Sequence, residues 1–206
     1  MADNASSGSK TGLIIGVVGG LVVLLLVAAV MFGNEEVGAE YGEPTIEGTS
    51  LPPFPGTESV DLSATGLPAP EVFGKNFDGQ DVSITNDGRA KGIVLVAHWC
   101  PHCQEEVPRV QEWLDTGGGV DGVDLYSIST AANSGRPNYP ASEWLDSEGW
   151  TVPTIVDDQA FSIHDAYGSG GFPYWVFLNA DGTVAVRTAG QLSIAQLEEV
   201  LNTLEQ

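Results

Sequence analysis

The longest hydrophobic stretch of the chain lies near its N-terminus. Residues 12–32 form 21 consecutive positions without a charged side chain. As a helix, this segment would extend about 31 Å, which is close to the hydrocarbon thickness of a bilayer. Its apolar core is longer than that of a cleaved signal peptide, and it has no polar face, which argues against a helix of a globular core. The pattern predicts a transmembrane anchor that follows a short polar N-terminal segment, residues 1–11.

Residues 33–66 follow neither the helical nor the strand period of apolar positions. They are rich in Gly, Pro, Glu, Ser and Thr, and they contain seven acidic side chains and no Lys or Arg. Such a composition is typical of an extended, self-repelling chain. We therefore predict a linker over residues 33–66. The alternative is that residues 51–55 pack on the surface of the domain that follows.

Short apolar runs and helical patterns alternate from residue 67 onward. Residues 93–97 are continuously apolar, which is typical of a strand buried on both faces of a sheet. Asp-Gly pairs at 78–79 and 181–182 separate strand-like runs and predict two hairpins. The expected strands are residues 72–77, 82–84, 93–97, 123–129, 154–156, 174–178 and 184–188. The expected helices are residues 100–113, 140–148, 161–167 and a last helix from residue 193.

The order of these elements defines the fold class. Strands and helices alternate, and a hairpin and a helix close the chain. The last helix begins with Ser193 and Gln196 at the spacing of a capping box. Because alternating strands and helices form a sheet that is covered by helices, we expect one α/β domain over residues 67–206, with a central mixed sheet.

The charge of the chain narrows the possible partners and predicts an orientation. The sequence has 28 acidic and 7 basic residues, which give a net charge of −21. Such a surface repels phosphate backbones, so nucleic-acid binding is excluded as a class of function. Lys10 precedes the apolar segment, and the next basic residue is Lys75. The positive-inside rule therefore places the N-terminus in the cytoplasm and the α/β domain outside the cell membrane.

The two cysteines of the chain carry the candidate chemistry. A buried strand ends and a helix begins at the motif Trp99-Cys100-Pro101-His102-Cys103. Two cysteines at this spacing across a first helical turn can form a disulfide. Free N–H groups and the helix dipole stabilise a thiolate on the first cysteine, and the second can attack a mixed disulfide that the first has formed. Cys100 is the candidate nucleophile, and Cys103 is the candidate resolving thiol.

Other uses of two cysteines agree less well with the sequence. A zinc site needs four ligands, which only His98, His102 and His164 could complete, and His102 is poorly placed to share a metal with both thiolates. Attachment of a c-type haem needs a histidine directly after the second cysteine, where the chain has Gln104. Two inert buried cysteines would not need Pro and His between them. We therefore favour dithiol–disulfide chemistry without a metal or a dissociable cofactor.

The segment around the cysteines resembles a known family. Residues 94–108, VLVAHWCPHCQEEVP, are similar to the active site of thioredoxin-fold proteins. Their end, Glu106-Val107-Pro108, resembles the membrane-anchored TlpA/ResA-type branch of thiol–disulfide oxidoreductases. The resemblance covers residues 67–206, and it implies a thioredoxin-like fold.

A second part of the resemblance lies further along the chain. Tyr167-Gly168 followed by Gly171-Phe172-Pro173 is similar to the cis-proline segment of that superfamily. Residues 179–182 are similar to the hairpin that follows this segment. The resemblance implies that Pro173 is in cis and faces Cys100 and Cys103.

The chain departs from the family pattern in three places. Thioredoxins carry a buried acid six residues before the first cysteine, where this chain has Val94, so proton transfer from Cys103 must use another group, with Glu106 or water as candidates. Phe172 stands where relatives usually have Thr or Val, which predicts a narrower substrate groove. The dipeptide between the cysteines resembles that of strongly oxidising periplasmic oxidases. Because a ring N–H of His102 would stabilise the Cys100 thiolate further, we expect an oxidant.

Two flanking features have two interpretations each. His98 directly precedes the motif, and it either tunes the thiolate or is a hydrogen-bonded histidine at the end of a strand. The loop of residues 133–140 is rich in turn residues, and it either borders the active site or is a solvated connection. The sequence alone favours the second interpretation in both cases.

Together these features predict an extracytoplasmic, single-pass enzyme of the cell membrane. It would exchange the Cys100–Cys103 disulfide or dithiol with protein thiols in the oxidising direction, and it would depend on a redox partner that the sequence does not identify. The alternative is a thioredoxin-fold binding module or a copper metallochaperone that keeps the cysteines without redox turnover.

Overall fold

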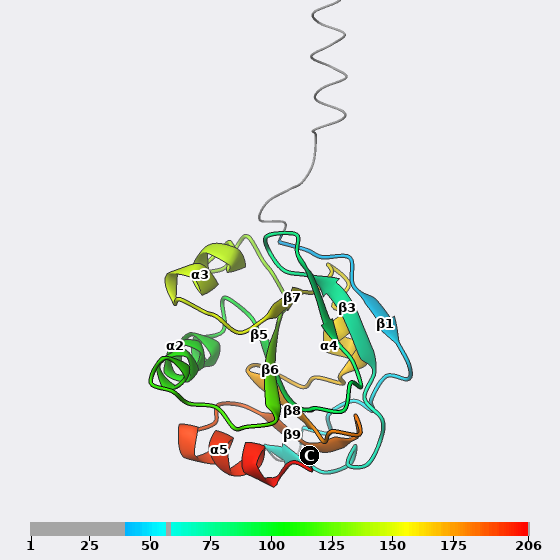
Figure 1. Cartoon of the computed structure of the whole chain (residues 1–206). Helices are drawn as coiled ribbons and strands as arrows, with labels where there is room; N and C mark the ends of the chain where they lie inside the picture. The colour runs from blue at the N-terminus through cyan, green and yellow to red at the C-terminus, as the bar shows by residue number, and fades with distance from the viewer. Residues whose placement is uncertain (1–39, 57–58, 206) are drawn as a thin grey trace, which may run out of the picture. The chain divides into compact units, whose positions relative to one another are not determined.

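A six-stranded mixed sheet forms the centre of the computed structural model, which describes residues 40–56 and 59–205 (Figure 1). The strand order is β2-β9-β8-β5-β6-β7. β5, β6 and β7 are parallel, whereas β8, β9 and β2 each run antiparallel to their neighbours. The strands are β2 (Val60–Asp61), β5 (Ala90–Val96), β6 (Val123–Ser129), β7 (Thr154–Val156), β8 (Tyr174–Leu178) and β9 (Val184–Ala189).

Helices cover both faces of this sheet. α2 (Pro101–Asp115), α3 (Ala141–Ser147) and α5 (Ile194–Thr203) pack in one hydrophobic cluster, and α4 (Ser162–Ala166) packs in the other. Figure 1 shows the first three helices on one side of the sheet and α4 on the other. A small antiparallel sheet lies on the α4 side, with the order β1-β3-β4. Its strands are β1 (Thr45–Glu47), β3 (Glu71–Lys75) and β4 (Asp81–Ile84).

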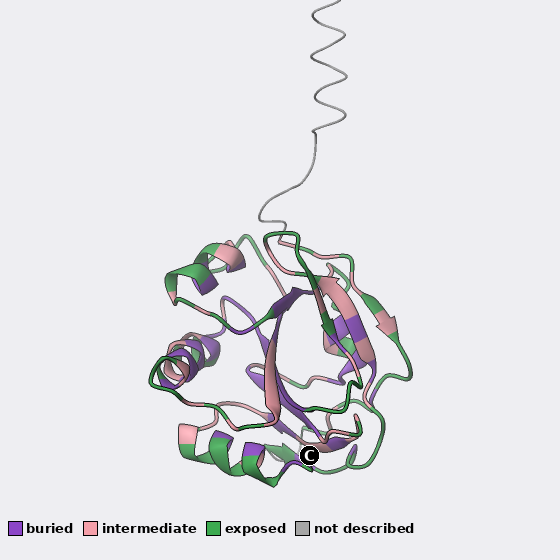
Figure 2. Cartoon of the chain, viewed as in Figure 1, coloured by how far each residue is buried: buried purple, intermediate pink, exposed green. Residues whose placement is uncertain are grey.

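The strand β5 is buried along its whole length (Figure 2). Ile93 and Leu95 belong to the cluster on the α4 side, whereas Val94 and Val96 belong to the cluster beneath α2 and α5. This alternation is the reason for the unbroken apolar run in the sequence, because successive side chains of a strand point to opposite faces. Burial on both faces fixes the position of the strand end that leads into α2.

The predicted elements from residue 67 onward are confirmed to within a few residues. β3 and β4 form the first predicted hairpin, and β8 and β9 form the second. The last helix begins with the predicted capping box, since the Ser193 side chain accepts from the Gln196 backbone and Gln196 reaches back to Ser193. Local patterns therefore predicted the elements that define the domain.

The prediction that residues 33–66 form a linker without strands is wrong where the structure describes this stretch. β1 pairs with β3, and β2 pairs with β9. Leu51 is 4% exposed and packs in the core, in line with the alternative that residues 51–55 lie against the domain. Strands of two or three residues have no recognisable period, and their partners lie far away in the sequence.

A buried ion pair joins this N-terminal stretch to the central sheet. The Arg187 guanidinium on β9 donates to the Asp61 carboxylate, and both side chains are at most 3% exposed. The same guanidinium donates to the carbonyl oxygens of Pro52 at 2.8 Å and Tyr167 at 3.1 Å. Residues 52 and 61 are thereby connected to the segment that leads from α4 to β8.

The predicted membrane anchor, residues 12–32, lies outside the described residues. Within residues 40–56 and 59–205, no helix is both long enough and apolar enough to cross a bilayer.

Candidate active site

The two cysteines lie at the junction between β5 and α2. Cys100 is the N-cap residue of α2, with extended backbone angles of φ −78° and ψ 119°. Pro101 occupies the first turn, where its missing N–H removes no helical hydrogen bond. The Cys100 N–H donates to the Ala97 carbonyl at 3.0 Å, which fixes the turn between strand and helix. Cys103 follows inside the first helical turn, as the sequence predicts.

The two thiols have opposite electrostatic environments. A hydrogen bond from the Cys103 thiol, followed by the backbone N–H groups of residues 103 and 102 and the charge of His102, lowers the pKa of Cys100 to about 6, although burial opposes this shift. Burial, and next the hydrogen bond to Cys100, raises the pKa of Cys103 far above its ordinary value. At neutral pH, Cys100 is therefore a thiolate and Cys103 stays protonated.

The segment before β8 forms the opposite side of the site. The Phe172–Pro173 peptide bond is cis, which confirms the expectation from the resemblance. The Cys100 sulfur lies 3.4 Å from the Phe172 carbonyl oxygen, to which the thiol donates when it is protonated. The Gly190 N–H donates to the Pro173 carbonyl oxygen at 2.8 Å. These contacts bring Pro173 and Cys100 to the same site from distant parts of the chain.

The N-terminal stretch supports the cis-proline segment from behind. The Phe54 N–H donates to the Gly168 carbonyl oxygen at 2.8 Å, and the Phe54 ring meets Tyr174 edge to face at 5.5 Å. A Cβ added to Gly170 would lie only 2.7 Å from the Phe54 ring. Residues that the sequence suggested as a linker therefore hold the proline loop in place.

Aromatic side chains border the thiol pair. Trp99 is half-buried, and its ring meets the edge of the Phe172 ring at 6.0 Å. The Phe172 ring also lies 5.6 Å from the His164 ring. Phe172 therefore contacts both Trp99 and His164, and its predicted narrowing of a substrate groove stays a prediction.

Glu106 is buried in α2, one turn after Cys103, and is 1% exposed. Its carboxylate accepts from the Trp175 indole at 2.6 Å and from the Leu192 N–H at 3.2 Å, and the Arg109 guanidinium lies 3.6 Å away. Burial raises the pKa of Glu106 to about 7, despite these hydrogen bonds. Its charge is also among the causes that raise the pKa of Cys103, so the two groups interact.

Trp175 joins the β5 position of the usual acid to Glu106 on α2. Trp175 is the cross-strand partner of Val94, the position where thioredoxins carry that acid. Its indole reaches from β8 to the Glu106 carboxylate. A buried carboxyl group with a raised pKa therefore comes from α2 instead of from β5.

The structure separates the predicted site residues into two groups. The first group lies at the thiol pair and consists of Cys100, Trp99, Pro101, His102 and Pro173. In this group, the His102 side chain is exposed. Glu106 is sealed in the interior beside Cys103. Sequence reasoning missed Trp175 and Arg136, which lies over the Trp99 ring at 4.8 Å. The scarcity of basic residues is the one signal that could have drawn attention to Arg136.

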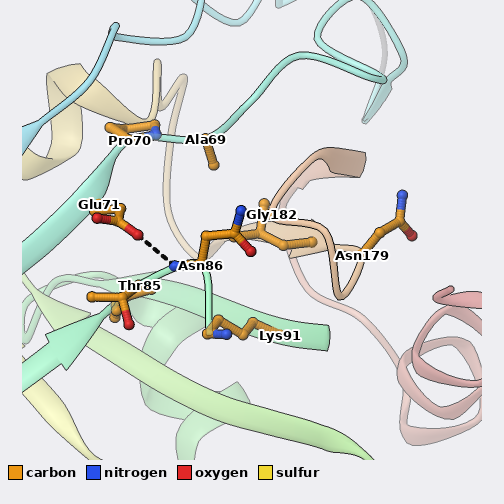
Figure 3. Close-up of a pocket in the computed structure, with 10 residues that line it drawn as sticks. Ala69, Pro70, Glu71, Thr85, Asn86, Lys91, Asn179 and Gly182 are labelled. Carbon is orange, nitrogen blue, oxygen red and sulfur yellow. Dashed lines mark hydrogen bonds between the residues drawn. The ribbon is translucent and has the colours of Figure 1, made fainter. Parts of the chain in front are cut away.

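Two further features bear on ligands. Among residues 40–56 and 59–205, no three His, Cys, Asp or Glu side chains are grouped in a way that could hold a metal ion. A cavity of about 10 Å³ lies between the start of β5 and the hairpin at Gly182, with Glu71, Asn86 and Lys91 in its wall (Figure 3). This volume holds about one water molecule, so the cavity is too small for a substrate.

Sequence comparison places these residues in a family context. The AhpC/TSA family matches residues 65–187 of the chain. Sporulation thiol-disulfide oxidoreductase A of Bacillus subtilis (strain 168) is 25% identical over 146 residues, which cover 71% of this chain and 86% of that protein. Thiol-disulfide oxidoreductase ResA of Halalkalibacterium halodurans is 20% identical over 145 residues, which cover 70% of this chain and 79% of that protein. The segment matched by the family contains both cysteines and the cis-proline.

Solved structures share the architecture. A DsbF homologue from Corynebacterium diphtheriae has a TM-score of 0.61 and 20% identity, over 76% of this chain and 100% of that chain. The thioredoxin domain of a thiol-disulfide oxidoreductase from Bacteroides vulgatus has a TM-score of 0.53 and 18% identity, over 68% of this chain and 96% of that chain. These likenesses identify the fold as thioredoxin-like and confirm the predicted fold class.

Proposed function

Since the chain belongs to the AhpC/TSA family, we propose that it is a protein thiol–disulfide oxidoreductase whose Cys100–Cys103 pair exchanges with protein thiols. The observation that carries this proposal is that the two thiols of the pair differ in pKa and in burial. A thiolate with a pKa of about 6 lies at a helix N-terminus, and a protonated, fully buried thiol lies one turn behind it. In such a pair, one thiol forms the mixed disulfide with the substrate, and the other thiol can break it.

The reaction is an exchange of sulfur–sulfur bonds. In the oxidising direction, a substrate thiolate attacks Cys100 in the Cys100–Cys103 disulfide, that bond breaks, and Cys103 leaves as a thiolate that takes up a proton. A second substrate thiolate then attacks the mixed disulfide, which releases oxidised substrate and leaves the Cys100 thiolate. Two electrons move from the substrate dithiol to the protein, and no dissociable cofactor is needed.

We assign the proton transfer at Cys103 to Glu106. A group that exchanges protons near neutral pH needs a pKa near the working pH, and the pKa of Glu106 is raised to about 7. The Trp175 indole and the Leu192 N–H orient its carboxylate. These observations favour Glu106 over water, the other candidate that the sequence left open.

We propose the oxidising direction because the thiolate stabilises the reduced form. The hydrogen bond from Cys103, the backbone N–H groups of residues 103 and 102 and the charge of His102 lower the pKa of Cys100 to about 6, which stabilises its thiolate. One pKa unit corresponds to about 1.4 kcal/mol, which is about 30 mV for a two-electron couple. The pair should therefore be more oxidising than thioredoxin, whose potential is about −270 mV.

The reduction potential of the full chain against glutathione tests this direction. We expect a value above that of thioredoxin, which is about −270 mV. His102→Pro removes both the backbone N–H and the imidazole that lower the pKa of Cys100, so it should lower the potential by roughly 20–30 mV. His102→Ala keeps the N–H and should have a smaller effect. A wild-type potential at or below about −270 mV, or an unchanged potential in His102→Pro, would show that the direction is wrong.

We also propose that residues 12–32 anchor the enzyme in the cell membrane with residues 40–206 outside the cytoplasm. The support is the 21-residue uncharged segment and the position of Lys10 before it. Protease added to intact cells should remove the domain, and protection of the domain would contradict this orientation.

A further inference from the structure

The connection between β6 and α3 is held against the active site by His98. The loop of residues 131–140, named the 131–140 loop below, lies between these elements. His98 is 1% exposed, and its Nε2 accepts from the Asn133 N–H at 3.0 Å. Since a backbone N–H can only donate, the ring proton is on Nδ1, which donates to the Pro137 carbonyl oxygen at 2.7 Å. Both ring nitrogens therefore bind this loop, whose residues 133–139 are exposed to solvent.

Further contacts fix the shape of the 131–140 loop. The Trp99 indole donates to the Ala131 carbonyl oxygen at 2.8 Å. Ala131 and Asn138 have φ values of 55° and 59°, in the left-handed region that non-glycine residues rarely occupy. Such conformations persist where the surrounding structure enforces them, and they are frequent at ligand-binding sites. The loop is therefore a positioned wall of the site.

Arg136 is the exposed side chain that this loop carries over the motif. Its guanidinium carbon lies 4.8 Å from the centre of the Trp99 ring. Residues 40–56 and 59–205 contain six Lys and Arg side chains, and the other five each have a carboxylate within 4 Å. Arg136 has no such carboxylate in that part of the chain, although the sequence has 28 acidic residues. A guanidinium that remains without an acid in so acidic a protein is available for an external anion.

The position of Arg136 links it to the reacting sulfur. Trp99 is the chain neighbour of Cys100, and its ring meets Phe172, whose carbonyl oxygen accepts from the Cys100 thiol. A polypeptide whose cysteine reaches Cys100 must pass this border of aromatic rings. A side chain next to that cysteine then comes within reach of the guanidinium, which binds carboxylates with two parallel N–H donors.

We infer that Arg136 recognises a carboxylate side chain close to the reactive cysteine of a polypeptide substrate, so that the enzyme prefers cysteines with a neighbouring Asp or Glu. This inference rests on the proposed function, because it concerns the attack of a substrate thiolate on the Cys100–Cys103 disulfide. The net charge of −21 repels acidic polypeptides at long range, but salt screens charges that lie more than about 8–10 Å apart. The preference therefore depends on direct contact between the guanidinium and the carboxylate of the substrate.

The test uses the oxidised full chain and three reduced peptides that differ only in a Glu, Gln or Lys beside the cysteine. Acid quenching and mass spectrometry give the rate at which each peptide reduces the protein. Each rate is divided by the rate of the same peptide with a small disulfide, because a neighbouring charge also changes the reactivity of the peptide thiol. For the wild type, we expect the Glu peptide to react about fivefold faster than the Gln peptide, as an exposed ion pair allows.

Three variants separate recognition from a structural role. Arg136→Met keeps an apolar stem over Trp99 and should reduce the Glu-to-Gln ratio to about one. Arg136→Glu should invert the preference toward the Lys peptide. Arg89→Met is the matched control, because Arg89 pairs with Asp124 at 2.6 Å and directly precedes β5, whose other end leads to Cys100; it should leave the wild-type ratio unchanged.

Other outcomes would overturn the inference, and they distinguish its failure from a failure of the proposed function. Equal normalised rates for the wild type, a ratio that survives in Arg136→Met, or an equal loss with all three peptides in that variant would show that Arg136 does not read a carboxylate. The proposed exchange reaction would still stand in each of these cases. If no peptide reduces the wild-type protein, the proposed function fails together with the inference.

Discussion

Replacing Cys100 by serine is expected to abolish thiol–disulfide exchange, with activity falling to the level of the buffer control. In the proposed exchange, Cys100 is the sulfur that bonds to the substrate in both directions, and a serine hydroxyl does not ionise in this pH range or form disulfides. In contrast, Cys103→Ser keeps the Cys100 thiolate, which can attack a substrate disulfide, and loses the thiol that would break the resulting mixed disulfide. This variant should accumulate mixed disulfides with substrate proteins through Cys100, which non-reducing electrophoresis and mass spectrometry would detect.

The pH dependence of alkylation checks the same assignment. In the reduced wild type, the alkylation rate of Cys100 should rise with pH and reach half of its plateau near pH 6, where the pKa of Cys100 lies. The hydrogen bond from the Cys103 thiol is the largest cause of that low value. Cys103→Ala removes this donor and should move the midpoint to higher pH, whereas Cys103→Ser retains a hydroxyl donor and should move it less. Trapping through Cys103 in a Cys100→Ser variant would instead mean that the two roles are exchanged.

Asp61→Ala is expected to lower the free energy of unfolding by about 3–5 kcal/mol, because it leaves the guanidinium of Arg187 buried without its carboxylate. The Arg187 side chain is 0% exposed, so water cannot replace the lost partner. Chemical denaturation should show a lower midpoint at an unchanged slope. Asp81→Ala is the matched control: it breaks the exposed Lys75–Asp81 pair and should change stability by less than about 1 kcal/mol.

The pH dependence of stability has a defined sign for this pair. Burial opposes ionisation, but hydrogen bonds from Ser63 and Arg187 hold the pKa of Asp61 below its ordinary value. A carboxyl group with a lowered pKa in the folded state adds stability at neutral pH, and this contribution is lost as the pH falls through the acid range. The difference in stability between wild type and Asp61→Ala should therefore shrink in acid. A difference that stays constant down to low pH would contradict this account.

The sequence predicted the parts of the fold that depend on local signals. The apolar run of β5, the Asp-Gly turns and the capping box of α5 each reflect chemistry within a few residues. β1 and β2 were missed because their stability comes from partners in β3 and β9, to which nothing in their own composition points. Short strands in a Gly- and Pro-rich stretch thus look like a linker until their partners are known.

The candidate active site also combines residues that local patterns predicted with contacts between residues that are far apart in the sequence. Spacing and position predicted Cys100 and Cys103, since a helix start and two thiols suffice to define the chemistry. The contact between Trp175 and Glu106 joins residues 69 positions apart. The contacts of His98 with Asn133 and Pro137 span 35 and 39 positions. Periodicity and motifs do not encode such distances, so the surroundings of Glu106 and the position of the 131–140 loop could not be predicted from the sequence.

The inclusion of residues 40–66 in the fold changes the reach of the enzyme. A linker over residues 33–66 would have spanned up to about 120 Å. If residues 12–32 lie in the bilayer, residues 33–39 alone connect them to the described fold, and seven residues extend at most about 25 Å. On the proposed topology, the catalytic domain would stay within the reach of these seven residues from the membrane. Such a short tether would raise its effective concentration toward thiols that are held at the same surface, and it would keep the enzyme away from proteins that diffuse farther out.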